Sequence, residues 1–171
     1  MKLPIRNTIK KSKNFKLNYN QTYEQYPSLK PSGLWYQIKD YALKWGEMNW
    51  GTHFYKLDVN IKSIYIIKTY DDFITFTKKY GKIIKDKQFK MIVIDWRLVE
   101  KKYSGIEIRN YNSIMKIIDS EQIKKNNMGE LLYWFDTFDF NSGCIWNLSI
   151  IKDCSYLGKF DWTKKEKIRK Y

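Results

Sequence analysis

Carboxylates set among apolar and aromatic residues are the side chains of this sequence best suited to chemistry. Glu107 interrupts a short apolar run, Gly-Ile-Glu-Ile at 105–108, and Asp136 and Asp139 lie in the run Phe-Asp-Thr-Phe-Asp-Phe at 135–140. An apolar setting raises the pKa of a carboxyl group by desolvation, which suits it for acid–base work. The alternative for each acid is structural: a solvent-facing position on an edge strand, or a turn at the start of a strand.

Residue types exclude several other chemistries. The chain has one histidine, His53, and two cysteines, Cys144 and Cys154, which together cannot supply a four-ligand zinc site. No glycine-rich phosphate loop of Walker or Rossmann spacing occurs, and there is no Gly-x-Ser-x-Gly elbow. A single histidine also argues against most His-dependent triads. We therefore expect no metal site and two buried, reduced thiols.

The elements that must position these acids are mostly short strands. Period-two alternation and turn residues predict strands, whereas a cap, a 3.6-residue period or a closing glycine predicts helices. No βαβ alternation is evident, so the predicted fold class is α+β, with a split two-sheet β core and a few short helices. Strands are predicted at 15–19, 34–38, 52–59, 63–68 and 105–108, and helical segments after Asp40, from Asp71 to Gly81, at 95–103 and at 113–125.

The positive charge is concentrated at the two ends of the chain. The 171 residues carry a formal charge of +14, of which residues 1–23 hold +6, residues 157–171 hold +4 and the interior holds the remaining +4. We therefore predict a basic, mobile segment at 1–14, a single domain at 15–156 and a basic tail at 157–171. Only four of the 32 bases are arginine, and a lysine excess favours solubility or loose attraction to phosphate over fixed base readout.

The sequence predicts a cytoplasmic protein. No apolar segment follows the first lysines, as a signal peptide requires, and no stretch approaches the roughly 20 apolar residues of a membrane span. Ile, Asn and Tyr are frequent whereas Ala42 is the single alanine. This composition is typical of an AT-rich coding genome, such as a viral one, in which case the host cytoplasm is the expected location.

Four segments in succession resemble the ADP-ribosyltransferase superfamily, including small phage-encoded anti-CRISPR members. Residues 30–45, Lys-Pro-Ser-Gly-Leu-Trp-Tyr-Gln-Ile-Lys-Asp-Tyr-Ala-Leu-Lys-Trp, resemble its strand-then-helix element. Residues 52–67 resemble the strand pair that follows. Asp-Trp at 95–96 with Lys-Tyr-Ser-Gly-Ile-Glu-Ile at 102–108 is similar to a Tyr-Asp-Gly-Ile strand, and Asp-Phe-Asn-Ser-Gly-Cys-Ile-Trp at 139–146 is similar to the acid-bearing start of the last catalytic strand.

This resemblance implies that NAD binds as co-substrate in a cleft between two small sheets. Aromatic faces hold a flat, cationic nicotinamide ring well. The alternative for each aromatic residue is plain core packing. The residues expected at the ring are Trp35 or Tyr36 from the strand and Tyr41 or Trp45 from the helix.

The catalytic acid implied by the resemblance stabilises an oxocarbenium-like transition state and can orient or deprotonate the incoming nucleophile. Asp139 is the first choice because it precedes the final strand, Glu107 is the second and Asp136 the third. The superfamily normally has a His or Arg on its first strand for the adenosine ribose or a phosphate. The predicted strand around 14–20 has neither, so the expected substitutes are Lys16, Asn18 or Asn20, or else His53 from another strand.

The resemblance thus implies a mono-ADP-ribosyltransferase that acts on a macromolecular acceptor, either protein or nucleic acid. Two alternatives remain at this point. One is a catalytically inactive scaffold of the same fold that only binds a partner. The other is a basic module in which exposed Trp and Tyr rings stack on single-stranded nucleic acid.

Overall fold

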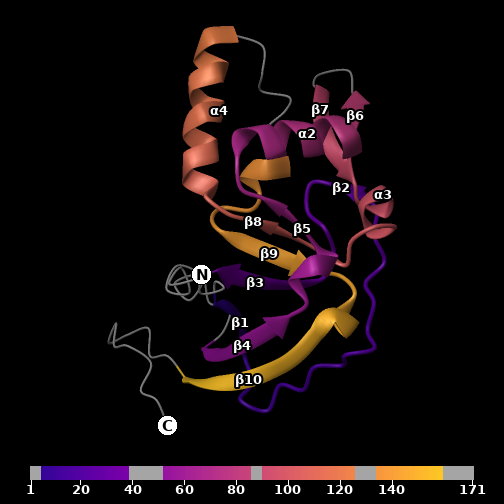
Figure 1. Ribbon diagram of the computed structural model, residues 1–171, viewed down its shortest axis with the longest axis vertical. Helices are drawn as coiled ribbons and strands as arrows, with labels where there is room; N and C mark the ends of the chain where they lie inside the picture. Colours follow the sequence, from indigo (N-terminus) through magenta and orange to yellow (C-terminus); the bar gives the residue numbers. More distant parts are fainter. Residues whose placement is uncertain (1–4, 39–51, 86–89, 126–133, 160–171) are drawn as a thin grey trace.

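The computed structural model describes residues 5–38, 52–85, 90–125 and 134–159 and has an α+β architecture built on two sheets (Figure 1). The elements in chain order are β1 (Arg6–Lys10), β2 (Pro27–Ser28), β3 (Leu34–Ile38), β4 (His53–Val59), η2 (Ile61–Ser63), β5 (Ile64–Ile67), α2 (Tyr70–Tyr80), β6 (Gly81–Lys85), β7 (Lys90–Asp95), α3 (Trp96–Glu100), β8 (Gly105–Ile108), α4 (Tyr111–Lys125), β9 (Ser142–Ile145), η3 (Leu148–Ile150) and β10 (Ile151–Lys159).

The larger sheet of these segments has seven strands in the order β10-β4-β1-β3-β9-β8-β5. β5 and β8 run parallel, whereas the other neighbouring strands of this sheet pair antiparallel. The parallel pair is joined through α2, β6, β7 and α3, a crossover that the search for βαβ alternation did not predict. β9 lies between β3 and β8 and so joins the two halves of the sheet.

β1 corrects the sequence interpretation of the first 19 residues. Arg6–Lys10 pairs along its length with β4 and, at Arg6 and Asn7, with β3. The segment predicted as a strand at 15–19 is irregular and ends in a turn at Tyr19 instead, and its alternation arises because Phe15 and Leu17 pack against the larger sheet. Since β10 also continues to Lys159, parts of both basic ends belong to the sheet and not to segments outside it.

The smaller sheet is antiparallel and has the order β2-β7-β6 among the described residues. β7 contains the apolar run Met-Ile-Val-Ile at 91–94, which was not among the predicted strands. β6 was hidden in the sequence because its residues, Gly-Lys-Ile-Ile-Lys, are exposed along the whole strand and show no inward-facing alternation. Edge strands of this kind are defined by pairing with a neighbour and not by burial.

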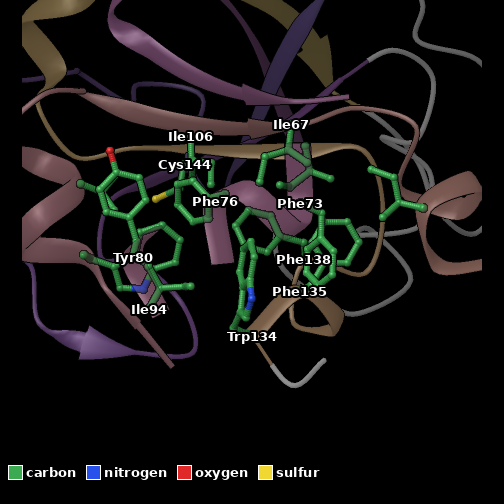
Figure 2. Packing of buried hydrophobic residues seen from close by; sticks show 14 of the residues in the cluster. Ile67, Phe73, Phe76, Tyr80, Ile94, Ile106, Trp134, Phe135, Phe138 and Cys144 are labelled. Atoms are coloured by element: carbon green, nitrogen blue, oxygen red, sulfur yellow. The ribbon is translucent and has the colours of Figure 1, made fainter. Parts of the chain in front are cut away.

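One face of the larger sheet is covered by an aromatic core. α2 begins at a capping box between Thr69 and Asp72 and ends before Gly81, in agreement with its predicted limits. Its inward residues Phe73 and Phe76 pack on Trp134 and on the strand residues beneath (Figure 2). The buried members of this core, here named the aromatic core, are Ile67, Phe73, Phe76, Tyr80, Ile94, Trp96, Val99, Ile106, Ile108, Tyr111, Ile114, Ile118, Trp134, Phe135, Phe138, Cys144 and Trp146.

The opposite face of the same sheet carries a second, more aliphatic core. Alternate residues of a strand point to opposite faces, so Trp35 and Cys144 face the aromatic core whereas Tyr36 and Gly143 face the other side. The buried members of this aliphatic core are Leu34, Tyr36, Ile38, Leu57, Val59, Ile64, Ile145, Leu148, Ile150 and Ile151. Polar side chains at the edge of this core form the candidate site.

Candidate functional site

Glu107 lies in the middle of β8 with no solvent exposure. All four residues of this strand are buried, because β8 is covered on both faces and paired on both edges with β5 and β9. A buried carboxylate is costly unless charged or hydrogen-bonding partners surround it. The position therefore needs an explanation from the residues around it.

Two side chains from distant strands hold the Glu107 carboxylate. Arg6 Nε lies 2.6 Å from Oε2 and Arg6 Nη2 lies 3.1 Å from Oε1, a two-pronged pair between residues 101 positions apart. The Tyr36 hydroxyl donates to the same Oε2 at 2.8 Å. Charge-assisted, bidentate bonds of this type are the strongest in proteins and fix geometry as well as charge. Arg6 is itself only 4% exposed.

Arg109 adds a second guanidinium to the same carboxylate. Its Nε and Nη2 each lie 2.5 Å from Glu107 Oε1. Arg109 follows β8 directly, two residues after Glu107, so both side chains leave the backbone on the same side. The Arg109 side chain is 22% exposed whereas that of Arg6 is 5% exposed, so solvent reaches the cluster on the Arg109 side. Two guanidinium groups face one carboxylate, which leaves an excess of positive charge.

Gly143 makes the contact between Tyr36 and Glu107 possible. Gly143 of β9 is the cross-strand partner of Tyr36 on one side and of Glu107 on the other. A Cβ built on Gly143 would overlap the Tyr36 ring and hydroxyl and lie 2.8 Å from the Ile106 carbonyl oxygen. The phenol therefore crosses β9 through the space left by the missing side chain. This steric requirement explains why a glycine stands at position 143, in the segment Ser-Gly-Cys-Ile-Trp.

Protonation in the cluster follows from burial and from the charge of Glu107. Burial and the adjacent carboxylate raise the pKa of Tyr36 well above its ordinary value, so the phenol keeps its proton and donates a hydrogen bond to Glu107. Burial alone would lower the pKa of the Arg6 guanidinium, but the hydrogen bonds and charge of Glu107 raise it overall. Both donors are therefore in the form that stabilises an ionised carboxylate.

On the opposite face of β1 and β3, two neighbouring amide side chains have buried atoms that make no hydrogen bond within the described part of the chain. Asn7 and Gln37 are cross-strand neighbours, and Asn7 Oδ1 and both amide atoms of Gln37 are buried without a hydrogen bond. Each is next in sequence to a member of the cluster, Arg6 or Tyr36. Buried unpaired amides cost stability and mark places where a bound group can complete the bonding.

Asp139, the first choice of the sequence analysis, lies in a different setting. Its side chain is 59% exposed, its backbone has a φ of 61°, and Lys30 Nζ lies 4.0 Å from its Oδ2. Lys30 also stands 5.3 Å over the Trp35 ring, and Trp35 packs on Phe138 at 5.1 Å. Asp139 and Trp35 therefore gather near the aromatic core, on the other side of the sheet from Tyr36 and Glu107.

The remaining expected residues are distributed elsewhere. Asp136 is exposed and accepts a hydrogen bond from the Tyr111 hydroxyl at 3.2 Å. Lys16 is exposed on the coil after β1, so it does not take the first-strand position for which it was expected. Tyr41 and Trp45 lie outside the described residues.

Arg6 and Arg109 are the members of the cluster that sequence reasoning missed. Two signals could have indicated them: arginine is rare in this lysine-rich chain, and Arg109 is spaced to share a strand face with Glu107. Arg6 also bears on the basic first-strand residue that the sequence analysis expected from the resemblance and did not find. The first strand of the sheet is β1, not the segment at 15–19, and it does contain an arginine.

Of the two thiols, Cys144 is buried and Cys154 is half-buried, and both are free. Burial raises the pKa of the Cys144 thiol well above its ordinary value, so it packs as a small apolar group. In the described part of the chain, no three His, Cys, Asp or Glu side chains lie together as metal ligands would. The helices described there are all too short or too polar to cross a membrane.

Comparison with known proteins adds no relative to this picture. A scan against protein-family models finds no match, and searches of curated proteins and of solved structures find no significant similarity. The function has to be inferred from the residues of the chain, above all from the cluster of Arg6, Tyr36, Glu107 and Arg109, which we call the Glu107 cluster.

Proposed function

We propose that the chain is a mono-ADP-ribosyltransferase that transfers ADP-ribose from NAD to a protein or nucleic acid, with Glu107 as its catalytic carboxylate. The proposal rests on one observation above others. An arginine of the first strand and a tyrosine of the Gly-Leu-Trp-Tyr strand meet on the acid of Tyr-Ser-Gly-Ile-Glu. These are the segments on which the resemblance depends, together with the basic first-strand residue that the sequence analysis did not find.

The chemistry asked of the cluster is substitution at C1′ of the nicotinamide ribose. The bond from C1′ to the nicotinamide nitrogen breaks and nicotinamide leaves with the electron pair, while the acceptor nucleophile forms a new bond to C1′ and loses its proton. Positive charge builds on the ribose in between, and the carboxylate of Glu107 would stabilise it electrostatically. The Tyr36 hydroxyl would hold the carboxylate in one orientation.

The two guanidinium groups suit the other end of the same substrate. Pyrophosphate is a dianion, and planar guanidinium groups bind phosphate oxygens in pairs. The cluster carries one more positive than negative charge, and its partly exposed member is Arg109. We therefore infer that NAD approaches from the Arg109 side and that Arg109 exchanges its contact with Glu107 for one with a phosphate.

The competing interpretation is a purely structural ion pair. A buried pair is weak support for stability, since apolar residues of similar volume stabilise a fold equally well or better. Two arginines on one fully buried glutamate leave one net positive charge in the cluster, which an anionic ligand would offset. This favours a binding function, and buried charged groups of this kind cluster at functional sites.

The test measures NAD binding by thermal shift and nicotinamide release by the purified chain. We expect NAD to raise the melting temperature of the wild type and nicotinamide to be released slowly without an acceptor. Glu107→Gln should lower release at least a hundredfold, the scale of losing one transition-state contact. Asp139→Asn, which also removes one carboxylate but at an exposed position, is the matched control and should keep wild-type release.

Tyr36→Phe keeps the ring and removes one hydrogen bond, so it provides a folded variant if Glu107→Gln does not fold. It should bind NAD and release nicotinamide more slowly than the wild type. Loss of release in Asp139→Asn with normal release in Glu107→Gln would move the catalytic role to Asp139. A wild type that neither binds nor cleaves NAD would leave the inactive scaffold as the function.

A further inference from the structure

A second ionisable surface lies at the far ends of β1, β4 and β10, away from the Glu107 cluster. The strand register brings Lys10, His53 and Lys159 into one row across three neighbouring strands. Adjacent strands are about 4.8 Å apart, so these three side chains are close neighbours. Repulsion between them is not relieved by an acid in the same row. We call this row, with Lys13, Phe15, Tyr55 and Tyr156, the basic aromatic surface.

Aromatic rings lie directly beside this row. Tyr156 is 37% exposed, its ring centre lies 5.3 Å from that of Tyr55, and its hydroxyl lies 3.0 Å from His53 Nδ1. Lys13 Nζ stands 5.9 Å from the Tyr156 ring centre. The surface therefore alternates lysine with an exposed, flat ring.

The coil after β1 is held in place on this surface. The Tyr55 hydroxyl bonds the carbonyl oxygens of Ser12, at 2.8 Å, and Lys13, at 2.5 Å. Phe15 packs edge-on against Tyr55 with ring centres 5.4 Å apart, and Lys10 Nζ lies 4.8 Å over Phe15. The lysines are thus presented by fixed backbone, so little conformational entropy remains to be lost when a ligand binds.

Charge along the strands indicates which end a polyanion would contact. Residues 1–23 contain six bases and no acid. The acids of the same strands, Asp58 and Asp153, are paired with each other in register toward the opposite end. At about 3.3 Å per residue, Asp58 lies roughly 16 Å along β4 from His53.

We propose that the basic aromatic surface binds single-stranded nucleic acid, with a base stacked on Tyr156 and phosphates at Lys10, Lys13 and Lys159. Exposed rings between cations are the arrangement that single strands recognise, since each unpaired base has a free face. A duplex hides those faces. Because the cations are lysines, they bind phosphate as point charges without reading the base edge, so binding is tolerant of sequence. This inference does not depend on the transferase activity.

Titration of His53 fits the same surface. The pKa of His53 is lowered mainly by burial and further by the positive charges of Lys159 and Lys13. Lys10 is its cross-strand partner, and the Tyr156 hydroxyl is its hydrogen-bond partner. A bound phosphate would offset the repulsion between these cations. Affinity for the polyanion should consequently rise as the pH is lowered through the pKa of His53.

The test is fluorescence anisotropy of the full chain with labelled 12-nucleotide single strands and the matching duplex at several salt concentrations, without NAD. We expect the single strand to bind more tightly than the duplex, and Tyr156→Leu to weaken it about tenfold with an unchanged salt slope. Lys13→Gln should reduce the slope of log affinity against log salt by about 0.7. The matched control is Lys116→Gln, an equal change of charge at an exposed position on α4.

Equal losses in Lys13→Gln and Lys116→Gln would overturn the proposal in favour of diffuse charge, as would tighter binding of the duplex. Binding of anionic vesicles or of a poly-glutamate peptide with the same dependence on Tyr156 would also overturn it. Tyr36→Phe, which keeps the ring and is expected to fold, should keep full affinity for the single strand while it releases nicotinamide more slowly. Failure of this surface is therefore distinguishable from failure of the transferase proposal.

Discussion

The two faces of the seven-stranded sheet each carry buried residues, but these residues are held by different kinds of contact. On the aromatic face, Trp134 contacts several other rings at once, so no single contact determines its position. On the opposite face, the side chains of Arg6, Tyr36 and Arg109 all converge on the carboxylate of Glu107. The dispersion energy of the aromatic face is therefore spread over many ring contacts, whereas all the ionic contacts of the opposite face depend on Glu107.

The ion pair of Asp95 and Arg97 can be compared with that of Arg6 and Glu107 to isolate the effect of burial. Arg97 binds Asp95 through two bonds of 2.8 and 2.6 Å, the same chemistry as Arg6 and Glu107. However, the Arg97 side chain is 51% exposed, whereas that of Arg6 is 5% exposed. We therefore expect similar geometry to give unequal effects on removal of one partner, because water and salt screen the pair with the exposed arginine more than the buried pair.

The largest effect is expected when Glu107 is removed. Glu107→Ala leaves two guanidinium groups without their counter-ion, so the free energy of unfolding should fall by about 3–5 kcal/mol. On the aromatic face, Phe73→Leu should cost only about 1 kcal/mol because the remaining rings repack. Urea denaturation followed by circular dichroism measures both.

The control for this comparison replaces the cluster as a whole. The triple variant Arg6→Met, Glu107→Leu, Arg109→Met removes all three charges and should recover most of the stability lost in Glu107→Ala. It should not cleave NAD. A triple variant as unstable as Glu107→Ala would contradict the view that unpaired charge causes the loss.

A smaller loss is expected from Gly143→Ala. The added methyl overlaps the Tyr36 ring, so the phenol must leave Glu107 or β9 must shift, at a cost of about 1–3 kcal/mol. Nicotinamide release should fall along with stability. In the double variant with Tyr36→Ala, the part of the cost caused by the ring should vanish while the part caused by the Ile106 carbonyl oxygen remains, and a double-mutant cycle with no coupling would show that the ring does not occupy that space.

The smallest effect is expected at the pair of Asp95 and Arg97, in which Asp95 is buried but the Arg97 side chain is 51% exposed. The Arg97 hydrogen bond lowers the pKa of Asp95 against the opposing effect of burial. A depressed carboxyl pKa adds stability that is complete above the unfolded value, near 4, and is lost as the pH falls through the folded pKa. Arg97→Gln should therefore be slightly less stable than the wild type at pH 7 and equal to it in strong acid.

Salt provides the check on that interpretation. One molar NaCl should remove most of the difference between Arg97→Gln and the wild type, because exposed charges are screened. The loss in Glu107→Ala should change little under the same conditions. A loss in Arg97→Gln that resists both acid and salt would contradict the assigned role of the ion pair.

Local signals predicted the elements whose pattern is complete within a few residues. α2 has its cap, its apolar period and its closing Gly81 in one stretch, and β3, β4 and β8 are mostly apolar or alternate between apolar and polar residues. β1 escaped because its five residues begin with Arg6 and end with Lys10, so its strand conformation depends on pairing with β3 and β4. Tertiary pairing of this kind overrides weak local preference.

The candidate site was predicted in part for the same reason. The apolar setting of Glu107 is visible in four residues, but its partner Arg6 is 101 positions away and no spacing rule connects them. Asp139 was predicted as the catalytic acid partly because aromatic residues precede and follow it in the sequence. Those rings do turn inward, whereas Asp139 itself occupies a left-handed turn that leaves its carboxylate exposed, and composition alone does not distinguish these directions.

The position of β9 in the sheet has a consequence for synthesis of the chain on the ribosome. This strand, Ser142–Ile145, separates β3 from β8, yet it is translated after both of them. Until it emerges, the nascent chain holds two partial sheets that cannot join, and Arg6 and Glu107 remain on different sides of the gap. A stalled or truncated product that ends before residue 142 should therefore be a target for chaperones and proteases.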